Sequence, residues 1–438
     1  MHAMQLLIYL LLLLIPSSSS DDDIARWRRG VAAGVPHASA CLGLSLFRAR
    51  RTDEAMPLLM AAEDWVSSEY LGGAFGMMAR KLATLPGHAA HEQEREALTQ
   101  SVVHFTRAAA RRRNDTACSP RALGMQPRPA KVHKQKCTTA FAQPRATVLR
   151  SWGDALAWLG RGADAARVWR SAEARALWPD PLCRAVSPLP ERRHGAVAGR
   201  YIFDASAAGF AHVATPVART LLPALCRELS ALAAAGGVEA LPWRAEAAGL
   251  HRGVKWSALV LRANGRAGAA CETNHFFPAT CALLHDDSES SLLRRVPALD
   301  VQRGQVKLSR MEPGAVVRPH SGPSNARLRM HCAVDLPPPS YHATPAGGTY
   351  LRVGTERRAW RGGECFVFRE DCEHEVRIAR DLGGPRVVLI IDFASPRLRD
   401  ADLYAGAVRP GSQGRARREF ERIIRAGGTE KAESSAGI

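Results

Sequence analysis

Lysine is scarce in this 438-residue chain: seven of its 60 basic residues are lysine, and the other 53 are arginine. The skew stands beside abundant alanine, which indicates coding bias as the source of the formal net charge of +18. The basic runs at residues 111–113 and 131–136 also lack the interleaved aromatic side chains on which nucleic-acid bases stack. A solvated loop is therefore the first interpretation of these runs, and attraction of acidic polypeptides is the second. We expect no nucleic-acid partner.

Apolar runs long enough to cross a bilayer are also lacking. The longest, Leu6–Ile15, spans at ~1.5 Å per residue only about half of a ~30 Å hydrocarbon core. Pro16 and four serines follow it, so residues 1–20 are predicted to be a cleaved signal peptide, although no Lys or Arg precedes the apolar run. The signal peptide predicts the secretory pathway. Membrane association is expected only in the alternative case of an uncleaved anchor.

Strand-like alternation is missing between residues 38 and 181, where alanine and leucine recur at spacings of three and four. This spacing predicts an α-helical domain over residues 21–185. Within it, Ser151–Pro179 resembles a tetratricopeptide helix pair. One repeat cannot bury its face alone, so neighbouring repeats are expected around residues 40–110. An irregular helical domain is the alternative.

Short alternating runs separated by Gly, Pro and Asn turns begin at Trp256 and are typical of a double-stranded β-helix, or jelly roll. The predicted fold class is therefore α+β with two domains. We place a Pro-containing linker at residues 186–200, the β-domain at residues 201–400 and a basic, flexible tail at residues 401–438. Val217–Ala235 is predicted to be an amphipathic helix that packs on the outside of the sheet.

Ten cysteines behind a signal peptide predict some disulfides. Cys271 and Cys281 bracket a short polar loop and are the predicted pair. Cys332 falls on the core side of its alternating run and is predicted to be a buried thiol. A glycosylation sequon at residues 114–116 agrees with a lumenal chain, although such triplets are common by chance.

The stretch Ser309–His331 and the later run around His374 carry the candidate chemistry. The alternation from Leu328 onward places Arg329 and His331 side by side on the face away from the core, where they could hold a small anion. Taken singly, His320 and His374 each fit an exposed turn or strand residue. Two imidazoles on different strands with arginines between them indicate a metal and a dicarboxylate.

Three segments, SRMEPGAVVRPHSGPSNARLRMH, FRED-CEHEV and RVVLIIDFASP, resemble the aspartyl/asparaginyl β-hydroxylase family of Fe(II)/2-oxoglutarate dioxygenases. The resemblance covers roughly residues 250–396. It implies a jelly-roll enzyme that uses O2 to hydroxylate the β-carbon of aspartate or asparagine residues in polypeptides, for example in cysteine-rich EGF-like modules. It also implies helical repeats upstream and a location in the endoplasmic reticulum lumen, with secretion as the alternative.

The same resemblance implies a role for each candidate residue. His320 and His374 would ligate iron. Ser309 and Arg386 would hold the distal carboxylate of 2-oxoglutarate, while Arg329 and His331 would lie at its metal end. Arg327 and Arg252 would bind the substrate.

Two positions bear on the activity. Gly322 stands where most iron oxygenases have their carboxylate ligand, and the β-hydroxylase family itself resembles this sequence there by having glycine. Ala258 stands where the family has a glutamine after its Trp-Ser pair, which leaves substrate preference open. The alternatives are a catalytically inactive helical-repeat interaction protein and a dioxygenase acting on a small amino acid; halogenation is a minor one.

Overall fold

The computed structural model describes residues 21–32, 39, 42–43, 45–46, 51–61, 65–83, 88–114, 145–185 and 200–395, except for residues 208, 247–249, 251–255, 273–275, 285–290, 302–303 and 337–347. Several predictions concern residues outside this set: the signal peptide, the linker, the tail, Arg252 and two residues of the sequon. The chain divides into two compact units, Met1–Pro181 and Leu182–Ile438. Each unit is described by itself.

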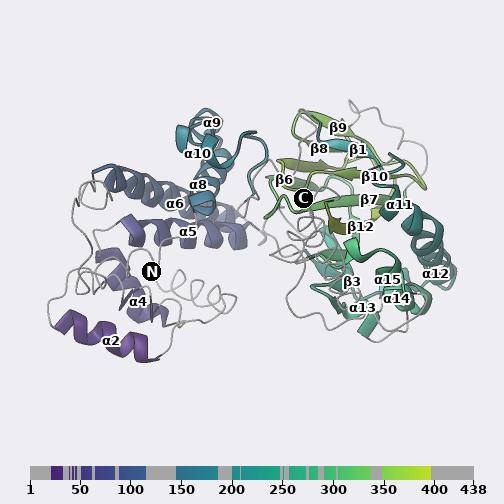
Figure 1. The fold of residues 1–438 in the computed structure, drawn as a ribbon, viewed down its shortest axis with the longest axis horizontal. Coiled ribbons are helices and arrows are strands. Elements are labelled where there is room, and N and C mark those ends of the chain that lie inside the picture. The colour runs from purple at the N-terminus through teal and green to yellow at the C-terminus, as the bar shows by residue number, and fades with distance from the viewer. Residues whose placement is uncertain are drawn as a thin grey trace, which may run out of the picture. The chain divides into compact units, whose positions relative to one another are not determined.

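The first unit is helical, as its residue spacing predicts (Figure 1). Its helices are α2 (Asp21–Ala32), α4 (Thr52–Ala61), α5 (Trp65–Leu82), α6 (His88–Asn114), α8 (Arg145–Trp158), α9 (Gly162–Trp169) and α10 (Ala172–Leu177).

Glycine permits the closest approach between two of these helices. A Cβ atom on Gly153 of α8 would lie 2.0 Å from the indole nitrogen of Trp169 on α9, so only glycine fits there. The helix pair within Ser151–Pro179 is therefore packed, while its assignment as a tetratricopeptide repeat stays a prediction. In the part of the chain that the structure describes, no helix has the length and apolar composition of a membrane span.

The described residues of the second unit form two antiparallel sheets (Figure 1). The larger has eight strands in the order β1-β10-β7-β12-β5-β3-β2, with β4 paired to β3. Its strands are β1 (Ile202–Asp204), β2 (Arg244–Ala245), β3 (Trp256–Ala263), β4 (Arg266–Ala267), β5 (Gln305–Met311), β7 (Arg327–Asp335), β10 (Cys365–Phe368) and β12 (Arg386–Ala394). The smaller has the order β6-β11-β8-β9, with β6 (Val316–His320), β8 (Tyr350–Val353), β9 (Glu356–Arg358) and β11 (His374–Arg377). The predicted combination of helices and sheets in one chain is thus confirmed.

Helices cover one face of the large sheet. They are α11 (Ala211–Pro216), which continues through a π-helical turn into α12 (Leu222–Ala234), and the short α13 (Ala269–Glu272), α14 (Pro278–Leu283) and α15 (Leu292–Arg295). Leu225 of α12 belongs to the same buried cluster as Leu308 of β5 and Leu389 of β12. The predicted amphipathic helix therefore packs on the sheet, and the face with Leu308 and Leu389 is the core side.

Three disulfides join cysteines of the second unit. Cys271 bonds to Cys281, the pair that the sequence predicts. The prediction of a free thiol at Cys332 is wrong, because Cys332 bonds to Cys365. These two residues lie directly opposite each other on β7 and β10, so both side chains point to the same face of the sheet. Only the pairing of those strands could reveal this bond. The third disulfide joins Cys183 to Cys372.

Candidate active site

The polar residues of the large sheet share its other face. Residues directly opposite each other on antiparallel strands point the same way, so the register decides which side chains meet. His331 lies opposite Ile390, which lies opposite Lys307. Arg329 lies opposite Asp392, and Ser309 lies opposite Val388. The polar side chains that β5, β7 and β12 place on this face include Lys307, Ser309, Arg327, Arg329, His331, Arg386 and Asp392.

The small sheet brings the two candidate metal ligands together. His320 on β6 and His374 on β11 are direct cross-strand partners, and their ring centroids are 4.1 Å apart. In each ring, Nδ1 lies 2.8 Å from the backbone carbonyl oxygen two residues earlier: that of Arg318 for His320 and that of Cys372 for His374. A carbonyl oxygen only accepts, so both Nδ1 atoms carry the proton. The Nε2 atom of each ring then has the lone pair that a metal ligand needs.

Aromatic contacts connect the two sheets at this point. The ring of Phe368, on β10 of the large sheet, lies 5.5 Å from His374 and 5.0 Å from His331. The face that carries His331 is therefore the face that meets β11. Histidines from β6, β7 and β11, which are separated in sequence, gather at one place between the sheets.

His331 has the opposite tautomer. The indole N–H of Trp360 donates to Nδ1 of His331 at 3.4 Å, which leaves the proton of a neutral ring on Nε2. Among the described residues, Nε2 of His331 has no hydrogen-bond partner, although the ring is buried. Burial, together with the charges of Arg386 and Arg329, holds the pKa of His331 well below its usual 6.5. A neutral His331 with this tautomer presents an N–H donor at Nε2, where His320 and His374 each present a lone pair.

This buried neutral histidine predicts a pH-dependent stability. Below pH 6.5 the unfolded chain takes up a proton at His331 that the folded protein does not bind. The free energy of unfolding of the metal-free protein should therefore fall with decreasing pH, by up to ~1.4 kcal/mol per pH unit from this group. Urea unfolding at pH values on both sides of 6.5 measures the slope. His331→Gln should reduce this slope by the contribution of one proton, about 1.4 kcal/mol per pH unit. His212→Gln, at an exposed position of α11, should leave the slope unchanged. Equal slopes in wild type and His331→Gln would contradict the prediction.

Two residues predicted to bind the cosubstrate are buried on the site face. Arg386 is 1% exposed, and its guanidinium lies 4.2 Å above the ring of Trp360. Ser309 accepts a hydrogen bond of 2.9 Å from the indole N–H of Trp256, so its own hydroxyl proton can still be donated. A buried guanidinium and a hydroxyl donor on one sheet face suit a carboxylate.

Arg327 and Arg329 already contact carboxylates that the sequence analysis did not consider. Arg327 makes two hydrogen bonds with Glu370, of 2.6 and 2.9 Å, and Arg329 makes two with Asp392, of 2.6 and 3.0 Å. Arg329 also lies 2.9 Å from Glu370. Burial alone would raise the pKa of Glu370, but Arg329 and Arg327 hold it far below its usual value. The four side chains form a buried, charge-balanced network, so the predicted contacts of these arginines with cosubstrate and substrate would be additional to their ion pairs.

The position of Gly322 leaves no room for a side chain. A Cβ atom there would lie 2.7 Å from the side-chain Cδ and 2.8 Å from the carbonyl oxygen of Glu370. The backbone N–H of Gly322 donates to that carbonyl oxygen at 2.6 Å. The carboxylate of Glu370 therefore occupies the space into which a carboxylate at residue 322 would extend.

Sequence reasoning missed four residues of the site: Lys307, Trp360, Glu370 and Asp392. Lys307 is buried and pairs with Glu246 at 2.5 Å. Asp392 follows five apolar residues, and an acid within such a run is a signal that could have been noticed. Nothing local marks Trp360 or Glu370. Of the predicted site residues, Arg252 lies outside those that the structure describes.

Comparison with known proteins gives a family match that lies within the second unit. Residues 222–396 match the family described as Aspartyl/Asparaginyl beta-hydroxylase. The aspartyl/asparaginyl beta-hydroxylase of Mus musculus is 37% identical over 144 residues, which are 33% of this chain and 17% of the mouse protein. The Homo sapiens protein of the same name is 35% identical over 144 residues, or 33% of this chain and 16% of the human protein. This chain thus spans only a small part of the length of these relatives.

Two further comparisons are weaker. The aspartate beta-hydroxylase domain-containing protein 2 of Mus musculus is 32% identical over 105 residues, 23% of this chain and 27% of that protein. Among solved structures, a prolyl-4-hydroxylase from Pseudomonas putida is 17% identical, with 40% of this chain and 88% of that chain covered and a TM-score of 0.25. A score this low supports no argument about the fold.

Proposed function

We propose that this protein is an Fe(II)- and 2-oxoglutarate-dependent dioxygenase that hydroxylates the β-carbon of aspartate or asparagine residues in polypeptides. The match of residues 222–396 to the family described as Aspartyl/Asparaginyl beta-hydroxylase supports the proposal. The observation that carries the proposal is the pair His320 and His374. Their ring centroids are 4.1 Å apart, and both have Nδ1 hydrogen-bonded to a carbonyl oxygen, which leaves the lone pair of each ring on Nε2, where a metal would bind.

The residues present fit iron. Neutral imidazoles suit Fe(II), and the absence of a ligand at Gly322 leaves coordination positions for cosubstrate and oxygen. In this proposal His320 and His374 hold the metal. When bound, iron supplies the redox chemistry that couples decarboxylation of 2-oxoglutarate to hydroxylation of a C–H bond.

The protein's own residues would bind and orient the organic molecules. Arg386 and Ser309 would hold the distal carboxylate of 2-oxoglutarate, and the Nε2–H of His331 would donate to the end near the metal. Arg329 would support that end through its charge. Arg327 and Arg252 would bind the polypeptide substrate.

The β-domain fold proposed for this activity is a double-stranded β-helix. The two antiparallel sheets support it, as does the position of the site between them. Ala258 lies directly opposite Ser309 on the site face. The methyl side chain of Ala258, in place of a longer amide, bears on whether aspartate or asparagine is preferred.

We also propose that the helical unit binds the polypeptide substrate, possible examples being cysteine-rich EGF-like modules. A cavity of about 580 Å³ in this unit supports the idea. Its lining combines apolar Val102, Leu149 and Trp152 with charged Arg161 and Asp164. Such a mixture suits a peptide segment, which presents both apolar side chains and polar backbone groups.

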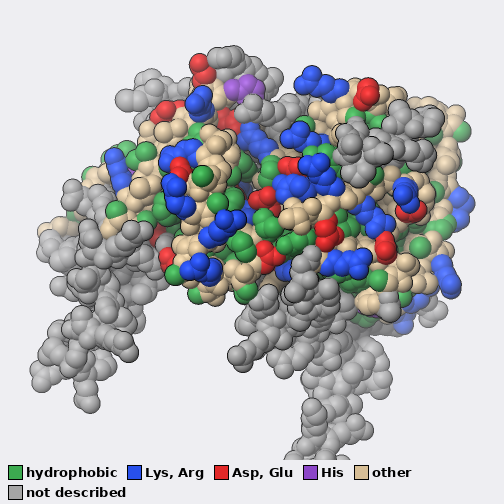
Figure 2. Space-filling model, turned by 90° about the horizontal axis from the view of Figure 1, so that it is seen from above, with side chains coloured by type: hydrophobic (Ala, Val, Ile, Leu, Met, Phe, Trp, Pro, Cys, Tyr) green, Lys and Arg blue, Asp and Glu red, His purple; other side chains and the backbone are tan. Residues whose placement is uncertain are grey.

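The proposed location is the secretory pathway, in the endoplasmic reticulum lumen or after secretion. Three disulfides in the second unit support an oxidising compartment. On the face shown in Figure 2, Lys and Arg side chains are interspersed with Asp and Glu side chains. That distribution supports the expectation that nucleic acid is not a partner.

The test is an assay of the full chain with Fe(II), 2-oxoglutarate, O2 and an acidic EGF-like peptide. We expect succinate, and one added oxygen atom on an aspartate or asparagine of the peptide by mass spectrometry. A matched peptide with Glu and Gln in place of Asp and Asn should remain unmodified. Product formed only from free aspartate would favour the small-molecule alternative, and the absence of succinate in every arm would favour an inactive interaction protein.

A further inference from the structure

The loop that leads into β11 is tied to a distant segment of the same unit. Cys183 and Cys372 form a disulfide between residues that are 189 positions apart in sequence. The two residues also pair as an isolated antiparallel bridge, and the N–H of Glu373 donates to the carbonyl oxygen of Leu182 at 2.6 Å. Residues 182–183 thus attach to the loop both covalently and through the backbone.

A buried ion pair reinforces the attachment. The guanidinium of Arg184, 1% exposed, donates to Glu373 at 2.8 Å. The second carboxylate oxygen of Glu373 accepts from Arg352 of β8 at 3.1 Å, and its carbonyl oxygen accepts from the N–H of Gly354 at 2.8 Å. The residue between Cys372 and His374 is therefore held from two sides.

These contacts reach His374 directly. The carbonyl oxygen that accepts the Nδ1–H of His374, at 2.8 Å, belongs to Cys372, whose side chain is in the disulfide. The orientation of the imidazole, and so of its Nε2, depends on the position of that peptide group. The corresponding residue for His320 is Arg318, which is not a cysteine; its N–H donates to the carbonyl oxygen of Leu250 at 2.7 Å. The covalent tie is specific to the second ligand.

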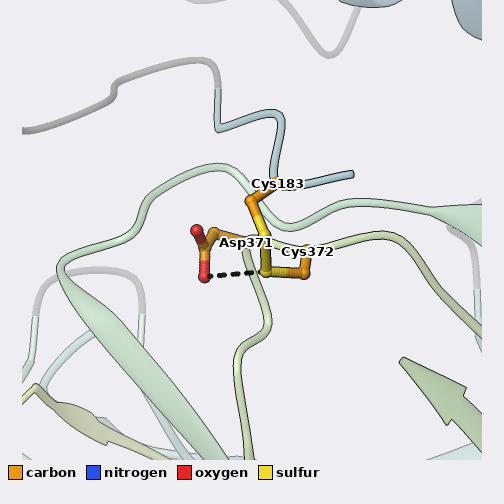
Figure 3. A group of neighbouring side chains, drawn as sticks. All are labelled: Cys183, Asp371 and Cys372. Atoms are coloured by element: carbon orange, nitrogen blue, oxygen red, sulfur yellow. Dashed lines mark hydrogen bonds between the residues drawn. A yellow bond between two sulfur atoms is a disulfide. The ribbon is translucent and has the colours of Figure 1, made fainter. Parts of the chain in front are cut away.

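Three side chains beside the disulfide, those of Cys183, Cys372 and Asp371, lie close enough together to suggest a separate metal site (Figure 3). Figure 3 shows the two sulfur atoms bonded to each other, with the Asp371 carboxylate beside them. That carboxylate lies 3.8 Å from the sulfur of Cys372 and accepts from Arg369 at 2.9 Å. Because sulfur in a disulfide is not a thiolate ligand, the group is explained by the disulfide itself.

We propose that the Cys183–Cys372 disulfide and the Arg184–Glu373 pair are positioning elements of the metal site. They fix the carbonyl group of Cys372, which orients His374 toward His320. The inference rests on the proposed function, in that it takes His374 as a metal ligand. It adds that residues just after the helical unit in sequence control the geometry of that ligand.

A disulfide that closes so long a loop also stabilises the folded protein as a whole by restricting the unfolded chain. The test must therefore separate positioning from stability. The matched control is the Cys271–Cys281 disulfide, which is buried in the helix-covered core of the same unit. Its removal also takes one crosslink out of the unit, but it does not change the loop that carries Cys372, Glu373 and His374.

The experiment compares Cys183→Ser/Cys372→Ser with Cys271→Ser/Cys281→Ser by Co(II) titration, at a temperature where both variants are folded by circular dichroism. We expect the first variant to bind Co(II) about 10- to 100-fold more weakly, with an altered visible spectrum of the bound ion, since outer-shell partners have effects of this size. The control should match the wild type in both. Arg184→Gln, which leaves every disulfide intact, should weaken binding in the same direction.

A second readout needs no metal. In the metal-free first variant, and not in the control, the amide of Glu373 should exchange hydrogen faster than in the wild type. Wild-type Co(II) affinity and spectrum in both Cys183→Ser/Cys372→Ser and Arg184→Gln would overturn the inference and leave the proposed function standing. If the cysteine variant does not fold, Arg184→Gln alone decides in the same way. Absence of Co(II) binding by the wild type would overturn the proposed function and the inference with it.

Discussion

The double substitution His320→Ala/His374→Ala is expected to abolish succinate formation. The substitution removes both proposed ligand nitrogens where β6 and β11 meet, since these two rings are the cross-strand pair there. Loss of an outer-shell partner alone typically costs 10- to 100-fold in metal affinity or activity. Loss of the ligands themselves should therefore exceed a factor of ~100. The measurement is succinate release with saturating Fe(II) and 2-oxoglutarate.

His212→Ala is the matched control, because it removes an exposed imidazole from α11 on the helix-covered side of the sheet. It should retain wild-type activity. Circular dichroism should show that both variants are folded, since neither substitution leaves a buried charge unpaired. Succinate formation by the double variant at a rate near that of the wild type would rule out the proposed iron site.

Glu370→Ala is expected to destabilise the protein strongly. Glu370 is buried and lies 2.6 Å from Arg327 and 2.9 Å from Arg329. Its removal leaves Asp392 as the only acidic member of the described network against two buried guanidinium groups. Breaking a buried pair by removing one partner typically costs about 3–5 kcal/mol. We expect a loss of that size in the free energy of unfolding, measured by urea denaturation at neutral pH.

Glu364→Ala is the control for this experiment. Glu364 is half exposed and lies 4.0 Å from Arg358, so its replacement should change the free energy of unfolding by less than ~1 kcal/mol. Equal midpoints for wild type and Glu370→Ala would contradict the network. Because the pKa of Glu370 is lowered, its stabilising contribution is complete above pH ~4.5 and is lost as the pH falls below that value. Glu370→Ala should therefore lose less stability in acid than the wild type.

The sequence by itself determined which residues of β7 share a face. Alternation from Leu328 onward separates Arg329 and His331 from Met330 and Cys332, because successive side chains of a strand point to opposite sides. The same local rule predicts the helical character of the first unit from its spacing of three and four. Family motifs supplied the roles expected of His320, His374 and Arg386. All of these follow from short stretches of chain.

Only the tertiary structure decided which strands pair and in which register. Pairing of β7 with β12 places Asp392 beside Arg329. Pairing of β7 with β10 places Cys332 beside Cys365, so that the two form a disulfide where the sequence predicts a free thiol. The contact of Glu370 with Gly322 and the bond between Cys183 and Cys372 likewise join segments far apart in sequence. No local pattern records such contacts, because they depend on how the sheets close and not on the propensity of any one segment.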